Sequence, residues 1–111
     1  MIGRTHRFHG YGSLRRVYAN GESVRGSLIN LKFSPRSPGK AYRAAVVVSR
    51  KVNKSAVVRN RIRRRIYELV RRSDNRPEST DLIFTVFSDQ VANLDAAKLA
   101  ATVDELLTKA K

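Results

Sequence analysis

The sequence predicts an α+β fold, a two-layer sandwich in which helices pack on a small, mostly antiparallel sheet. Two hydrophobic patterns alternate along the chain: period-two or continuous β-branched runs, typical of strands, and stripes of period 3.6, typical of helices. Their order is α-β-β-α-β-α, with one further short strand expected near residues 23–26. A chain of 111 residues can bury one core but not two, so a single domain is expected.

The N-terminal part predicts an arm followed by a short helix. Residues 1–12 mix Gly, Arg and His with isolated aromatics and fit no period, so they are expected to form a basic arm before a domain of residues 13–111. Ser13 is expected to cap the helix, which runs over residues 14–19, and Gly21 to end it in the left-handed conformation. Its apolar face, spaced i, i+3 and i+4, consists of Leu14, Val17 and Tyr18.

Two strands are predicted next. Residues 27–33 alternate in hydrophobicity, as a half-buried strand does. One face of this strand carries Ile29, Leu31 and Phe33, and the other carries Leu28, Asn30 and Lys32. The loop at residues 34–40 contains two prolines and a glycine. Residues 42–49 are nearly uninterrupted in their apolar character, which favours a strand covered on both faces or placed centrally.

The second half predicts a long helix, a strand and a last helix. The long helix, residues 55–72, has an apolar stripe of Val58, Ile62, Ile66, Leu69 and Val70. The third strand is expected at residues 81–88, and Asn93 is expected to cap the last helix. The buried face predicted for that helix includes Leu94, Ala97, Ala101, Leu106 and Leu107. If the strands on either side of the long helix are parallel neighbours, a right-handed crossover is the default.

Charge is strongly segregated along the chain. The net charge is +14, but residues 1–73 hold 19 Lys or Arg against two acids, whereas residues 74–111 hold four bases against seven acids. So many like charges oppose compaction unless a polyanion is bound, and nucleic acid is the commonest such partner. A merely well-solvated basic surface fits less well, because the charge is gathered in one part of the chain.

Composition excludes several other classes. The chain has no Cys, which excludes a disulfide scaffold, a thiolate zinc site and a thiol nucleophile. It has neither an apolar run of about 18 residues nor the apolar core of a signal peptide, so a soluble cytoplasmic protein is expected. Gly-rich phosphate loops, nucleophile–base patterns and acidic metal constellations are missing too, so no catalytic residue, metal site or cofactor site is predicted. His6 and His9 of the arm are expected to make flexible phosphate contacts rather than to bind zinc.

The long helix is the main candidate for nucleic-acid binding. Seven of the 14 residues from Arg59 to Arg72 are Arg, and only Glu68 is available there to pair with them. At about 100° per residue, Arg61, Arg64, Arg65 and Arg72 fall on one flank of the Ile62 stripe, and Arg59 and Arg63 on the other. The planar guanidinium suits phosphate because it donates two parallel hydrogen bonds. Asn60 either braces the helix to the preceding loop or contacts a nucleotide, and sequence reasoning leaves both open.

Tyr18, Asn30 and Lys32 form a weaker candidate site. An aromatic, an amide and an ammonium on neighbouring elements suit an extended single strand of nucleic acid. From composition alone, an ordinary amphipathic rim explains them better.

The stretch from Val46 to Glu68 resembles the protein subunit of bacterial ribonuclease P. The family's signature is a strand ending in Ser-Lys-Lys or a variant, a short loop, and Ala-Val-x-Arg-Asn-Arg-x-Lys-Arg opening a helix. The matching residues are Ser49, Arg50, Lys51, Ala56, Val57, Arg59, Asn60, Arg61, Arg63 and Arg64. The resemblance extends over nearly the whole chain.

This resemblance implies a left-handed β-α-β crossover and an accessory RNA-binding subunit. In that family a catalytic RNA with bound Mg²⁺ removes the 5′ leader from precursor tRNA, so the implied partners are these two RNAs, with neither membrane nor DNA. The large RNA is expected to contact Arg50, Arg59, Asn60, Arg61, Arg63, Arg64 and Arg65. A groove between the first helix and the sheet is expected to hold the leader, through Leu14, Tyr18, Asn30, Lys32, Val47 and Lys51.

Three sites depart from the family pattern, one of them Asn53 and Lys54 in a loop that often contains Gly, and alternatives to the family stay open. Leu14 replaces a usual aromatic, and Tyr67 replaces an Arg whose contact is then either lost or supplied by Arg65. A ribosomal or ribosome-assembly protein that binds rRNA is the main alternative. A DNA-binding protein fits less well, because the basic helix lacks a preceding partner helix joined by a short turn, and an autonomous nuclease lacks its acidic residues.

Overall fold

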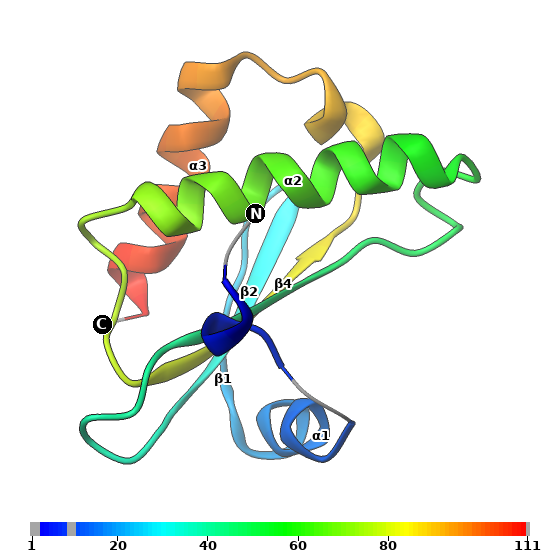
Figure 1. Ribbon diagram of the computed structural model, residues 1–111. Helices are drawn as coiled ribbons and strands as arrows, with labels where there is room; N and C mark the ends of the chain where they lie inside the picture. Colours follow the sequence, from blue (N-terminus) through cyan, green and yellow to red (C-terminus); the bar gives the residue numbers. More distant parts are fainter. Residues whose placement is uncertain (1–2, 9–10, 111) are drawn as a thin grey trace.

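The computed structural model describes residues 3–8 and 11–110, in which a four-stranded sheet lies between two layers of helices (Figure 1). The strands are β1 (Glu22–Val24), β2 (Ile29–Pro35), β3 (Arg43–Val47) and β4 (Thr80–Val86). The helices are α1 (Tyr11–Asn20), α2 (Ala56–Arg72) and α3 (Ala96–Lys109), with short 3-10 turns η1 (Arg4–His6) and η2 (Asp89–Ala92). The predicted α+β class, the element order and the short strand near residue 23 are confirmed, but α1 adds a partial layer on the second face of the sheet to the two layers expected.

The sheet order is β1-β2-β4-β3, and it differs from the expectation in one respect. The pairs β1–β2 and β2–β4 are antiparallel, and β3–β4 is parallel, so the mostly antiparallel sheet is confirmed. The unit β3-α2-β4 is a crossover between parallel neighbours, for which the family resemblance implies the left hand. The expectation that residues 42–49 form a strand placed centrally or covered on both faces is wrong: β3 is an edge strand with Val47 exposed, and the nearly fully buried β4 lies between β2 and β3.

Contacts from the N-terminal arm and from α2 cover the free edge of β3. Arg7 forms a parallel bridge with Ala44, the Tyr67 hydroxyl accepts a hydrogen bond from the Val46 N–H at 3.1 Å, and Arg63 donates to the Val48 carbonyl at 3.4 Å. An uncovered edge would offer its backbone groups to another chain. Tyr67 therefore has a structural role here.

The main core lies between one face of the sheet and the helices α2 and α3. Because side chains alternate along a strand, Ile29 and Leu31 of β2 share this face with Phe84 of β4, and all three are fully buried. Helix α2 begins after Ser55, whose hydroxyl accepts a hydrogen bond from the Val58 N–H. The predicted stripe of α2 is confirmed: Ile62, Ile66 and Val70 are buried, and Val58 and Leu69 are partly buried.

Helix α1 covers part of the opposite sheet face (Figure 1). Val17 of α1 and Ile83 of β4 are fully buried on this side. The helix begins at Tyr11, so the expectation that Ser13 caps it is wrong; the Ser13 hydroxyl instead accepts a hydrogen bond from Arg43. Gly21 does not adopt the left-handed conformation either. A Cβ there would lie 2.4 Å from the Val17 carbonyl oxygen, so the close backbone approach requires glycine.

Helix α3 differs in detail from its prediction. Asp95 caps it, whereas Asn93 ends η2. Leu106 and Leu107 are buried as expected, but Ala97 and Ala101 are exposed. The other two buried positions of α3 are Leu99 and Val103. The stripe was misjudged because small alanines fit both the buried and the exposed side of a helix.

The described part of the N-terminal arm is docked on the domain. The His6 ring stacks on Tyr42 with centroids 4.0 Å apart, and its Nδ1 lies 2.9 Å from the Tyr42 carbonyl oxygen. The expectation of a flexible phosphate contact does not fit this position of His6, and His9 lies outside the described residues. Among the described helices, none is both long enough and apolar enough to cross a membrane.

Candidate nucleic-acid interface

The outer surface of α2 and the loop before it carry unengaged cations. Arg50, Lys51, Arg61 and Arg64 are exposed, and within the described part of the chain their side chains make no hydrogen bond or ion pair. Helix α2 is held against the sheet by Ile62, Ile66 and Val70, so the opposite side of the helix faces solvent. We call Arg50, Lys51, Arg61 and Arg64 the cationic surface. Its guanidinium groups are available for bidentate contacts with phosphate.

Two further arginines of α2 also hydrogen-bond to the protein. Arg59 donates to the carbonyls of Asn53 and Lys54 at 3.0 and 2.8 Å and so fixes the loop that precedes α2. Arg63 donates to the Asn60 side-chain oxygen at 2.8 Å, so Asn60 orients a neighbouring arginine. The structure gives Asn60 no hydrogen bond to the preceding loop among the described residues, and contact with a nucleotide stays a prediction.

Arg65 is turned against the protein. Its two terminal nitrogens donate to the carbonyls of Val91 and Leu94, at 2.7 and 2.5 Å, and clamp α2 to the segment between η2 and α3. The prediction that arginines lie on two flanks of the helix is confirmed, because Arg63 contacts the Val48 carbonyl after β3 and Arg65 contacts the Val91 carbonyl in η2. The RNA contact expected of Arg65 is not supported by this geometry, because both terminal nitrogens already have acceptors.

The sheet face opposite the main core is the second candidate surface. Helix α1 crosses one end of this face, and the remainder is open. We call this part the open sheet face; its side chains are those of Asn30, Lys32, Val47, Thr85 and Phe87, with Tyr18 of α1 at its border. Strand register brings Asn30 and Val47 beside Thr85, from β2 and β3 respectively. Residues remote in sequence thus meet on one surface, as the groove prediction requires.

The polar groups of the open sheet face suit a single strand of nucleic acid. The Lys32 ammonium lies 5.8 Å from the centroid of the Tyr18 ring, and Tyr18 is 46% exposed. The Asn30 side-chain oxygen accepts a hydrogen bond from the Gly26 N–H, which leaves its amino group to donate. Of the other predicted groove residues, Leu14 is half-buried on α1 and Lys51 is exposed in the loop after β3.

Sequence reasoning missed Phe87, which is 54% exposed. The alternation of side chains along β4 could have indicated this residue: Val86 is buried in the core, so Phe87, the next residue, lies on the open side of the sheet. The Phe87 N–H still donates to the Leu28 carbonyl, so the residue follows the ladder past the last assigned position of β4.

A buried ion pair fixes α1 on the sheet beside the open sheet face. Arg43 donates to both carboxylate oxygens of Asp81, at 2.7 and 2.8 Å, and to the Ser13 hydroxyl at 3.2 Å. The hydrogen bonds to Asp81 raise the pKa of Arg43, so the guanidinium stays charged. Because Ser13 belongs to α1 and Arg43 to β3, this network sets the position of Tyr18 relative to the strands.

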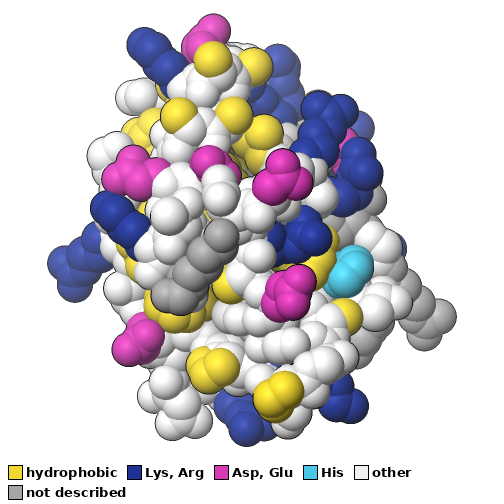
Figure 2. Space-filling view, turned by 90° about the vertical axis from the view of Figure 1, so that its left-hand side faces the viewer, with side chains coloured by type: hydrophobic (Ala, Val, Ile, Leu, Met, Phe, Trp, Pro, Cys, Tyr) yellow, Lys and Arg dark blue, Asp and Glu magenta, His cyan; other side chains and the backbone are white. Residues whose placement is uncertain are grey.

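Several acidic residues gather at one end of the molecule, whereas Asp89 lines a pocket with Arg61 of the cationic surface. Figure 2 faces the end of the molecule where α2 and the chain end, and shows Asp and Glu over the middle of this surface with Lys and Arg mainly towards its edges. Glu22, Asp74 and Glu78 line a pocket of about 630 Å³ there. In the described part of the chain no three His, Cys, Asp or Glu side chains gather as a metal site would need.

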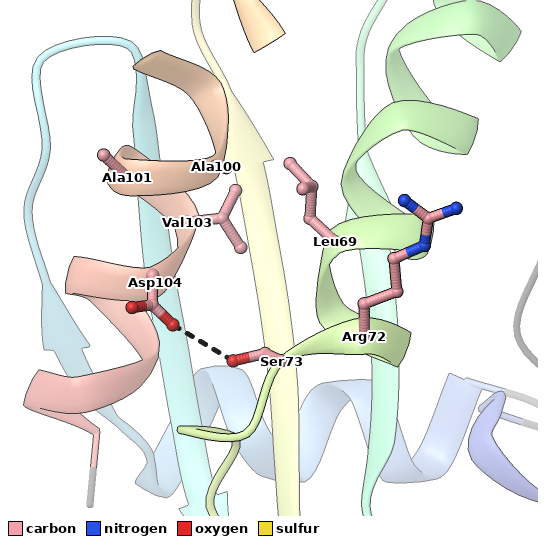
Figure 3. A pocket seen from close by; sticks show the side chains of 7 residues that line it. All are labelled: Leu69, Arg72, Ser73, Ala100, Ala101, Val103 and Asp104. Carbon is pink, nitrogen blue, oxygen red and sulfur yellow. Dashed lines mark hydrogen bonds between the residues drawn. The ribbon is translucent and has the colours of Figure 1, made fainter. Parts of the chain in front are cut away.

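A pocket of about 290 Å³ separates the end of α2 from α3 (Figure 3). It is lined by Leu69, Arg72, Ser73, Ala100, Ala101, Val103 and Asp104. The Ser73 hydroxyl donates to Asp104 at 3.1 Å across it, and Asn75 donates to the same carboxylate. These contacts hold the chain after α2 to α3, and the pocket is structural.

The fold and its surfaces define a small nucleic-acid-binding domain: a cationic helix on one side of a mixed sheet, and an open face with aromatic and polar side chains on the other. Comparison with known proteins identifies the type. The family model described as Ribonuclease P matches residues 2–111, and this chain belongs to that family.

Sequence relatives and solved structures agree with this family. The ribonuclease P protein component of Caldanaerobacter subterraneus subsp. tengcongensis is 34% identical over 86% of this chain and 80% of its own length. That of Lactobacillus delbrueckii subsp. bulgaricus is 30% identical over 96% of each chain. The RNase P protein structure from Staphylococcus aureus has the same fold, with a TM-score of 0.82, 21% identity and 97% coverage of both chains. That from Thermotoga maritima also has a TM-score of 0.82 at 21% identity, over 95% of this chain and 97% of its own.

Proposed function

We propose that this chain is the RNA-binding subunit of ribonuclease P that assists the catalytic RNA in removing the 5′ leader from precursor tRNA. Its cationic surface binds the large RNA, and its open sheet face binds the leader. The observation that carries the proposal is the presence of both surfaces on a chain that the family model covers almost completely. Nothing favours the ribosomal alternative.

The contribution of the protein is electrostatic and positional. Two RNAs that approach each other repel through their phosphates, and cations that neutralise phosphate release bound counterions. Arg61 and Arg64 supply such charge from a rigid helix, while Arg59 and Arg63 hold the loop and the strand end in place. Binding of the leader on the open sheet face then fixes the substrate relative to the RNA on α2.

Hydrolysis belongs to the RNA partner in this proposal. Magnesium ions bound by the RNA supply the chemistry, and residues of the chain bind and orient RNA without taking part in bond cleavage. The proposed compartment is the cytoplasm.

Reconstitution tests the function. Precursor tRNA cleavage by the catalytic RNA is measured at low Mg²⁺ with and without the chain, and we expect the chain to increase the rate. Cleavage of precursor tRNA by the purified protein free of RNA, or no effect on the RNA, would refute the proposal. Sequencing of the RNA retained by the protein in pull-downs distinguishes ribonuclease P RNA from rRNA.

Salt dependence tests the electrostatic part. If about five phosphates are neutralised, the logarithm of the affinity for RNA falls by about 3.5–4.5 per tenfold increase in salt. A flat response would exclude phosphate neutralisation as the basis of binding.

A further inference from the structure

Phe87 has an exposed aromatic side chain that is not part of the hydrophobic core. It is 54% exposed, whereas its neighbour Val86 is 2% exposed and packs in the main core. A large apolar side chain that stays exposed to solvent contributes little to the stability of the fold, because stability comes from burial of apolar surface. Exposed aromatic side chains are groups on which the bases of single-stranded RNA stack.

Phe87 and Tyr18 lie well apart on the open sheet face. Lys32, whose ammonium lies near the Tyr18 ring, pairs with Ile83 of β4. Phe87 follows Ile83 by four residues, which at about 3.4 Å per residue is about 14 Å along the strand. Stacked bases are only about 3.4 Å apart, so this spacing along the strand favours contacts of the two rings with bases that are not adjacent.

Two cations lie at the same end of the sheet as Phe87. Strands β3 and β4 are parallel, so the residues that follow them, Arg50 and Lys51 on one and Phe87 on the other, emerge at the same end of the sheet. A hydrogen bond of 3.0 Å from Asn53 to Asp89 ties the two following segments together. An aromatic ring at the same end of the sheet as an exposed arginine and an exposed lysine can offer a platform for a base while the cations contact phosphate.

We propose that Phe87 is a second base-stacking position for the leader, distinct from that at Tyr18, and that it extends the length of leader that the protein senses. The inference rests on the proposed function. It assigns the leader a path along the open sheet face from Tyr18 to the end of β4, where Arg50 and Lys51 of the cationic surface begin.

The test measures binding of precursor tRNAs to the complete RNA–protein complex. Substrates carry leaders of increasing length, with a leaderless tRNA as the reference, and the variants are Phe87→Ala, Phe87→Leu, Phe87→Tyr and Tyr18→Ala. We expect Phe87→Ala to weaken binding of long-leader substrates about 5-fold and to leave short-leader and leaderless substrates unchanged. Phe87→Leu behaves like Phe87→Ala because it lacks a ring, and Phe87→Tyr binds like the unaltered protein.

Single abasic nucleotides in the leader locate each position. Removing the base that stacks on Phe87 abolishes the difference between the unaltered protein and Phe87→Ala, and the corresponding position for Tyr18→Ala lies at least two nucleotides away. Glu105→Ala is the control, because Glu105 is exposed on α3 and lies outside both the cationic surface and the open sheet face. Thermal unfolding of each variant is measured to check that it is folded.

The outcomes separate this inference from the proposed function. Leader-dependent losses for Tyr18→Ala without any for Phe87→Ala would overturn the second position and leave the leader-binding function intact. Equal losses for leaderless and leader-bearing substrates with Phe87→Ala would also overturn it, since the residue would then act on another part of the complex. If neither variant shows a leader-dependent loss, the open sheet face does not bind the leader, and the proposed function fails with the inference.

Discussion

The two faces of the sheet are built from alternate residues of the same strands, yet they have different uses. On the covered face, Ile29, Leu31 and Phe84 are fully buried beneath α2 and α3. On the open sheet face, Val47 and Phe87 are exposed, and Asn30 and Lys32 are half-buried. Adjacent residues of β4 and its continuation therefore face either the packed core or the open surface, so a chain this small has room for both a core and the proposed recognition surface.

The arginines of α2 differ in the same way. Arg65 donates to two backbone carbonyls of its own chain, whereas Arg61 and Arg64 face solvent. A uniformly basic sequence is thus divided by the fold into structural braces and available cations.

The largest expected effect comes from two phenylalanines of one strand. Phe84→Ala removes a fully buried ring and is expected to destabilise the protein by about 3–5 kcal/mol. Phe87→Ala, three residues on and on the other face, is expected to cost less than about 1 kcal/mol. Urea unfolding measures both, and similar losses for the two variants would show that the faces do not differ in stability.

The buried ion pair gives the next effect. Asp81→Ala leaves Arg43 without its partner at a largely buried site and is expected to cost about 3 kcal/mol. Glu105→Ala removes the exposed pair with Lys109 and is the control, with a change within about 0.5 kcal/mol. Chemical denaturation compares them, and equal effects would contradict the bracing role of Asp81 beneath α1.

Arg65 and Arg61 separate structure from binding on α2. Arg65→Gln removes charged donors from two carbonyls and is expected to cost about 1.5–3 kcal/mol of stability. Arg61→Gln is expected to leave the stability unchanged but to lower the salt slope of RNA binding by about 0.7–0.9. Unfolding and salt-dependent binding are measured on both variants, and a reversed pattern would mean that the two arginines have exchanged roles.

The smallest effect is a pH dependence at the end of α2. Hydrogen bonds from Arg71 lower the pKa of Glu68 from 4.5 to about 2. A carboxyl with a lowered pKa stabilises the folded state above its unfolded pKa and loses this contribution as the pH falls through the folded value. The stability difference between the unaltered protein and Glu68→Gln is therefore expected to be constant above about pH 4.5 and to disappear near pH 2. Unfolding midpoints between pH 2 and pH 7 provide the check, and a loss centred near neutral pH would contradict it.

Local patterns in the sequence determined the elements and much of the site. The period of 3.6 in α2 predicted its bounds and its stripe, and the alternation in β2 placed Asn30 and Lys32 on the face opposite Ile29 and Leu31. Charge segregation and the Arg59-Asn60-Arg61 motif indicated a nucleic-acid partner. Such features depend on residue spacing and total charge, which need no knowledge of neighbours.

Only the tertiary structure decided which side chains are free. Whether β3 is central, whether Arg65 reaches a carbonyl and whether Phe87 is covered depend on segments remote in sequence, such as η2 and α1. The physical reason is that a guanidinium or a ring acquires its role from the acceptors and atoms within a few ångströms, and chain folding brings these together without leaving a trace in local periodicity. The sequence determined that α2 is cationic and the sheet two-faced; the packing of α1 and η2 decided which cations and rings face a partner.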